Sequence, residues 1–142
     1  MKVDKFILAT FLILFLSCTG KESNGISELE NEINKLESLE DKKQYLEKIL
    51  EDDQKVRGIE GQELMLKYGK DSKEHMDYIK AQWKQDEINL RKIETYLGKY
   101  DYPKKDEMGR DVATAPWIVI HHQTDTEIRN RNFETLCTKL HY

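Results

Sequence analysis

Residues 71–98 read DSKEHMDYIKAQWKQDEINLRKIETYLG and predict one long amphipathic helix. Asp71 or Ser72 can cap its start, Glu74 can reach back to the cap, and Gly98 can end it. The apolar residues recur at alternating spacings of three and four, which places them on one helical face. That face consists of Met76, Ile79, Trp83, Asp86, Leu90, Ile93 and Leu97.

A similar pattern precedes this helix. Apolar residues from Ile26 to Val56 have helical spacing and predict amphipathic helix in two segments. On the second segment, Asp53 and Arg57 continue the face that leucines begin, and their spacing of four lets them pair with each other. Gly58 and Gly61 are expected to end this helix.

The pattern after residue 98 is less regular. Residues 100–109 contain Pro, Gly and several charges, so we expect a loop. Thr114 then predicts the start of a short helix, with Pro116 in its first turn and with Trp117 and His121 on one face. Residues 124–127 form a capping box that opens a last helix. The sequence therefore predicts an all-α fold, a small irregular bundle of amphipathic helices, as a single domain over residues 26–142.

The N-terminus has the features of a secretory signal. Lys2 and Lys5 precede an apolar run over residues 6–16, which is too short to span a bilayer, and Ser17 and Cys18 follow it. This ending resembles the lipoprotein box of bacteria, in which the cysteine is acylated after cleavage. The resemblance implies a signal peptide over residues 1–17, palmitate or a similar lipid on Cys18, and a flexible tether over residues 18–25. We then expect a lipid-anchored protein of the bacterial cell envelope, facing the periplasm or the exterior.

Composition limits the partners. Cleavage before Cys18 would leave 125 residues, enough for one domain, and would move the formal net charge from −4 to −5. Lys and Arg alternate with Asp and Glu, which argues against nucleic acid and against electrostatic adhesion to anionic lipid. Cys137 would be the only remaining thiol, so no internal disulfide is expected. We expect it to be a small structural residue on a helix.

Two predicted helices thus carry one aspartate each inside an apolar face. A buried carboxylate needs a cation, hydrogen-bond donors, a metal or water, and Arg57 is the simplest partner for both. Asn89 adds a polar group one turn after Asp86, and the helical pattern turns His121 inward. The candidate polar site consists of Asp53, Gln54, Arg57, Asp86, Asn89, His121 and His122.

These residues resemble an uncharacterised bacterial family described as a domain of unknown function. Its pattern is D-Q-x-x-R, then D-x-x-N, a Y-G-W-P-like turn, a glycine, and an apolar run ending in Q-H before an aspartate. Residues 45–135 follow this order, with Asp101 in place of the turn glycine and His121 in place of the glutamine. The resemblance therefore selects His122 as the family histidine. It also implies a domain that is incomplete at its C-terminus, because family members continue with a further segment.

Function follows from these features only in outline. We expect a helical binding or structural module whose ligand, protein or small molecule, is not specified by the sequence. The alternative is a hydrolase or metal-dependent enzyme using the Asp, His and Arg cluster. No recognised metal-ligand pair, phosphate loop, nucleophile elbow or C-x-x-C occurs, so no metal or cofactor is predicted. A buried polar network that only fixes helix register explains the same residues.

Overall fold

The computed structural model describes residues 20–139, which form α-helices and, within that range, no strand. This confirms the predicted all-α class and small bundle. The predicted signal peptide and Cys18 lie outside the described residues. The helices are α1 (Gly20–Asn34), α2 (Leu39–Lys55), α3 (Glu60–Tyr68), α4 (Lys73–Lys99), α5 (Lys105–Met108), α6 (Arg110–His121) and α7 (Thr126–Lys139).

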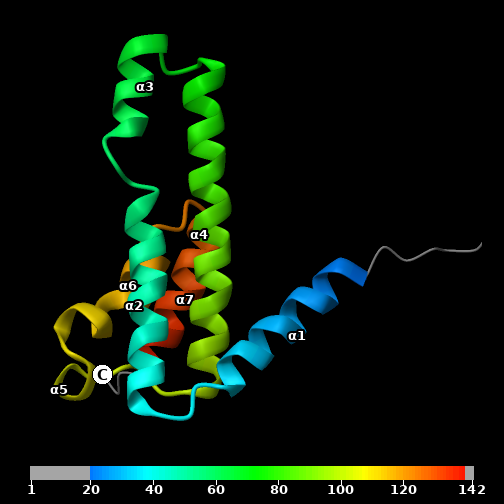
Figure 1. Cartoon of the computed structure of the whole chain (residues 1–142), viewed down its shortest axis with the longest axis vertical. Helices are drawn as coiled ribbons and strands as arrows, with labels where there is room; N and C mark the ends of the chain where they lie inside the picture. Colours follow the sequence, from blue (N-terminus) through cyan, green and yellow to red (C-terminus); the bar gives the residue numbers. More distant parts are fainter. Residues whose placement is uncertain (1–19, 140–142) are drawn as a thin grey trace, which may run out of the picture.

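Helix α4 is the long predicted helix and runs the length of the molecule (Figure 1). Ser72 caps it by accepting a hydrogen bond from the backbone N–H of His75. Its C-terminal half packs against α1, α2 and α6, and the hydrophobic core lies between these helices. The core consists mainly of Ile33, Tyr45, Leu46, Ile49, Leu90, Ile93, Tyr96, Leu97, Met108, Val112, Ala115, Val119, Ile120 and Leu136.

Helices α1 and α2 are the two predicted segments, separated by a short turn. Ser38 and Asp41 form a capping box at the start of α2, which explains why the helix begins again there. A flexible tether was predicted over residues 18–25, but residues 20–25 of that range belong to α1, which begins at Gly20. Lys21 and Glu22 are good helix formers, so the helix can extend toward the N-terminus from the turn anchored by Ile33. Helix α1 diverges from the bundle, as Figure 1 shows.

The N-terminal half of α4 has a different environment. Among the described helices, only α3 packs against it, and the two form a hairpin that extends beyond the bundle (Figure 1). Trp83 was predicted to face the core but is 48% exposed. The sequence pattern shows which face of a helix is apolar, but it does not show how far along that face a neighbour extends.

Gly61 has a role that the sequence did not reveal. It was expected to break a helix, yet it lies buried inside α3 against the ring of Tyr78 on α4. A Cβ at this position would clash with that ring, so the close approach of the two helices requires glycine.

Helix α6 begins earlier than predicted. Its first residue is Arg110, after Gly109 at a φ of 85°, so Thr114 is not the N-cap and Pro116 lies inside the helix. Gly109 tolerates the left-handed backbone that ends α5, and α6 can start directly from it. In α7, Asp125 caps the helix through the N–H groups of Glu127 and Ile128.

Over residues 20–139, no helix combines the length and apolarity needed to span a membrane. Cys137 is on a helix, as predicted, but its thiol is exposed and not in a disulfide.

Candidate functional site

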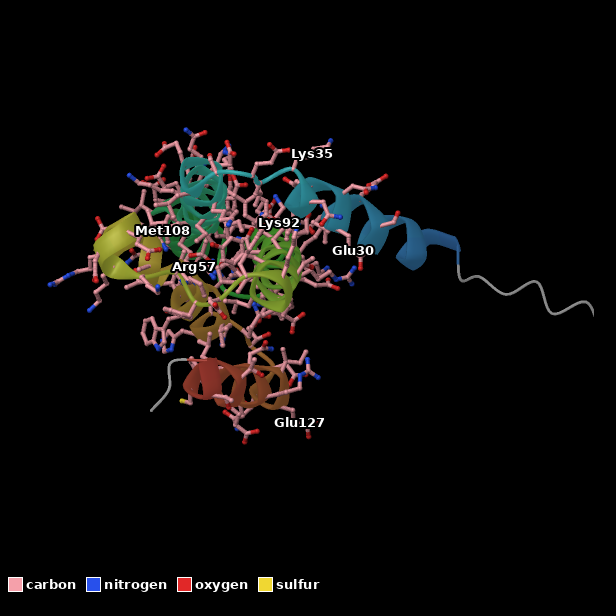
Figure 2. The ribbon with its side chains drawn as sticks, turned by 90° about the horizontal axis from the view of Figure 1, so that it is seen from below. Glu30, Lys35, Arg57, Lys92, Met108 and Glu127 are labelled. Atoms are coloured by element: carbon pink, nitrogen blue, oxygen red, sulfur yellow. The ribbon has the colours of Figure 1, made fainter. Side chains whose placement is uncertain are left out.

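A cluster of charged side chains forms where α2, α4 and α6 meet. Asp53 comes from the last turn of α2, Arg57 follows that helix, Asp86 lies in the middle of α4, and His122 is the C-cap of α6. Viewed along the bundle, Arg57 lies among these three helices (Figure 2). We call Asp53, Arg57, Asp86 and His122 the charged cluster.

Arg57 holds the charged cluster together. Its Nη2 lies 2.6 Å from Oδ1 of Asp86 and 3.3 Å from Oδ1 of Asp53, and its Nε lies 3.0 Å from Nδ1 of His122. The predicted pairing of both aspartates with Arg57 is therefore confirmed. Asp53 is fully buried and the Arg57 side chain is 16% exposed, so these contacts form in a partly desolvated environment.

The hydrogen on Nδ1 of His122 determines what this histidine can do. The same nitrogen lies 3.0 Å from the Asp53 carboxylate and 3.0 Å from Nε of Arg57. It can donate to Asp53 or accept from Arg57, but one nitrogen cannot do both. The buried carboxylate is the stronger acceptor for an N–H, and Nη2 of Arg57 keeps both carboxylates as its own acceptors. We therefore assign the hydrogen to Nδ1, which makes Nε of Arg57 a close neighbour of His122 and not its hydrogen-bond donor. In the neutral imidazole the free acceptor is then Nε2, and the His122 side chain is 26% exposed.

The two aspartates have different surroundings. Asp53 also accepts a hydrogen bond from Nε2 of Gln54 at 2.8 Å. Asp86 has Arg57 as its side-chain partner. Burial raises the pKa of Asp86 above its ordinary value, although the hydrogen bond and charge of Arg57 oppose the shift. The nearby Asp53 carboxylate also raises the pKa of Asp86, because two like charges share one cation.

Gln123 belongs to this region and was missed by the sequence argument. It is buried, and its Nε2 donates to the backbone carbonyls of Asp86 and Val119 at 3.2 Å each. This side chain ties the end of α6 to the middle of α4, which positions the neighbouring His122. The only sequence signal was its place directly after the two histidines.

Three predicted site residues lie outside the charged cluster, and of these only Gln54 bonds one of its members, Asp53. His121 is exposed and stacks on Trp117 with ring centroids 4.9 Å apart, so the inward orientation predicted from the helical pattern is wrong. His122 takes that place because it lies three residues after Val119 on the buried face of α6. Asn89 is buried, but it accepts from Gln85, and its own Nδ2 has no partner among the described residues.

An open hollow lies beside the charged cluster, between α3 and α4. Its volume is about 290 Å³, close to the lower end of the ~300–1,000 Å³ typical of small-molecule pockets. Arg57 forms part of its wall, so the hollow and the charged cluster share a residue. The remaining lining is Gly58, Gly61, Gln62, Met65, His75, Tyr78, Ile79 and Gln82.

The charged cluster does not have the arrangement of a metal site. Within residues 20–139, no three His, Cys, Asp or Glu side chains are placed to hold a metal ion. The two carboxylates converge on the guanidinium group instead, which occupies the position where a cation would neutralise them.

Comparison of the chain with protein-family models, curated proteins and solved structures finds no match. Function is therefore inferred from the geometry of the site.

Proposed function

We propose that this chain is a lipid-anchored module of the bacterial cell envelope that binds a small ligand in the hollow between α3 and α4. The position of Arg57 carries the proposal. Its guanidinium group is fixed by Asp53 and Asp86 behind it, and its side chain forms part of the hollow wall. A donor held in this way loses little conformational entropy when a ligand binds.

The lining favours a neutral ligand. The charge of Arg57 is already balanced by two carboxylates, so the hollow offers no net positive charge to an anion. Gln62 and Gln82 bring amide groups that both donate and accept, and Met65 and Ile79 bring apolar surface. A small molecule with hydroxyl or amide groups and one apolar face, such as a sugar, fits this chemistry.

Titration with glucose and N-acetylglucosamine, followed by backbone amide NMR, tests the proposal. Saturable shifts are expected at Gly58, Gly61 and His75, which surround the hollow. Gln82→Ala should weaken binding about tenfold, whereas Gln44→Ala, an exposed amide that bonds Glu40 on α2, should not. Absence of saturable shifts with both sugars would reject a neutral polyol as the ligand.

The anchor is tested separately by intact mass. After expression in a host that processes lipoproteins, the mass should correspond to loss of residues 1–17 and gain of three acyl chains. Cys18→Ser should abolish both changes. An unprocessed wild-type mass would remove the lipid anchor from the proposal without affecting the hollow.

Hydrolysis is the second candidate, and the contact of Asp53 with His122 favours it. A histidine whose Nδ1–H is held by a carboxylate can take a proton from water at Nε2. The hydroxide so formed would attack an ester or amide carbonyl. Hydrolysis of p-nitrophenyl acetate should then fall to background in His122→Asn and stay unchanged in His121→Asn. Equal rates in both variants would remove the hydrolase candidate.

A further inference from the structure

The hairpin of α3 and α4 ends in an exposed apolar tip. Leu66 is 75% exposed and Tyr68 is 47% exposed, and Met65, which also lines the hollow, is 38% exposed. Single exposed apolar residues are common, but three within four positions, at the end of an element that extends from the bundle, form a local surface. Figure 1 shows this tip at the end of the molecule opposite the turns that follow α1 and α4.

The charge of the tip differs from that of the rest of the chain. Residues 65–73 contain Lys67, Lys70, Lys73 and Asp71, a formal net charge of +2 in a chain of −4. Lys73 is paired with Asp77, so Lys67, Lys70 and Asp71 remain, and the two lysines still give this stretch a net positive charge of +1. The ammonium of Lys67 lies 4.8 Å from the ring centroid of Tyr68. The tip is thus a local exception to the mixed charges elsewhere.

We propose that this tip, Met65 to Lys70, contacts the surface of an anionic lipid bilayer. Leucine, methionine and tyrosine flanked by lysines are the residues that enter the interface, with the apolar groups below the headgroups and the ammonium groups among the phosphates. Tyrosine favours this depth because its ring is apolar and its hydroxyl is polar.

A bilayer fits the tip better than a protein partner does. Helix α3 has nine residues, and its outward surface is too small for the ~1,200–2,000 Å² that stable protein interfaces bury. A bilayer requires no complementary shape. The attraction of a short tip is weak by itself, and its effective concentration at the membrane rests on the lipid anchor proposed above.

Hydrogen exchange of the full chain tests this contact locally. The purified protein is placed in vesicles of phosphatidylcholine alone or with 30% phosphatidylglycerol, and exchange is followed for residues 62–73. We expect exchange at least threefold slower in the anionic vesicles, and most of this protection lost in 0.5 M NaCl.

Paired variants identify the side chains. Leu66→Glu should remove the protection, whereas Ile59→Glu should retain it, because Ile59 is 70% exposed but lies at the other end of α3. Replacing Lys67 and Lys70 by Gln should also remove it. Equal exchange in both vesicle types would overturn the proposal. If exchange at residues 62–73 slows with rising protein concentration in the absence of lipid, the tip contacts a second copy of the chain, and the proposal is overturned. The intact mass of the same sample shows whether the chain carries its lipid, so loss of the anchor is distinguished from failure of the tip to bind, and no ligand of the hollow is present in the experiment.

Discussion

Replacement of Arg57 by Met tests the charged cluster most severely. The substitution keeps the apolar stem and removes the cation that faces Asp53 and Asp86. Removing one partner of a buried pair costs about 3–5 kcal/mol, since the other partner remains buried and uncompensated. The Arg57 side chain is 16% exposed, and His122 still contacts Asp53, so we expect the lower end, about 3 kcal/mol. For a domain of this size the midpoint of thermal unfolding should fall by about 10 °C.

Urea unfolding followed by circular dichroism measures this loss. Arg91→Met is the matched control, because Arg91 pairs with Glu87 one turn away on the exposed face of α4. Such exposed pairs contribute about 0.3–0.5 kcal/mol, so the control should be almost as stable as the wild type. A loss below about 1 kcal/mol for Arg57→Met would show that the two aspartates are hydrated and do not need the cation.

The pH dependence of the same variant gives a second check. Arg57 lowers the pKa of Asp86 against the effect of burial, so its removal should raise that pKa further. A carboxyl whose pKa is higher in the folded state than in the unfolded state stabilises the fold in its protonated form. This contribution to the free energy of unfolding is lost as pH rises through the folded-state pKa. The deficit of Arg57→Met should therefore shrink as the pH falls from 7 to 5. A deficit that grows on acidification would refute the reasoning.

Three other substitutions test separate parts of the structure. Asp86→Asn removes a carboxyl whose pKa is raised in the folded state, and the wild type loses the associated stability as pH rises through that pKa. The stability of Asp86→Asn relative to the wild type, measured by urea unfolding, should therefore increase between pH 4 and pH 7. The opposite trend would show that the pKa of Asp86 is lowered. Tyr45→Phe removes a buried hydroxyl that has no partner among the described residues, and it should leave the unfolding free energy unchanged or raise it by about 1 kcal/mol. Gly61→Ala should lose about 1–3 kcal/mol by pressing on Tyr78, while Gly58→Ala, where a Cβ meets no atom, should lose nothing. Equal melting temperatures for the two glycine variants would contradict the close packing of α3 on α4.

The helices that the sequence predicted are those with a continuous apolar face. Helix α4 has apolar residues at alternating spacings of three and four, and α2 has leucines that lead to Asp53. These patterns are local, because a helix shows them whichever neighbour covers its apolar face. The pairing of Arg57 with both aspartates was predictable for the same reason, because charges on an apolar face require a partner.

The features that were missed depend on contacts between distant segments. Gly61 appeared to be a helix breaker because nothing near it in the sequence indicates that Tyr78 packs against it. Trp83 has the spacing of a core residue, but its exposure depends on how far neighbouring helices extend along α4. The choice between His121 and His122 depends on which face of α6 is buried: His122 lies three residues after the buried Val119, whereas His121 shares the exposed face of Trp117.

The tautomer of His122 tests the account most directly. Long-range ¹⁵N–¹H NMR of the histidine rings, recorded near pH 8 for the wild type and Asp53→Asn, distinguishes which ring nitrogen carries the hydrogen. The account predicts the hydrogen on Nδ1 of His122 in the wild type, and a change of tautomer or a large shift in the variant. Hydrogen on Nε2, with a spectrum that the variant leaves unaltered, would contradict the coupling of Asp53 to His122 and with it the preorganised cluster behind Arg57.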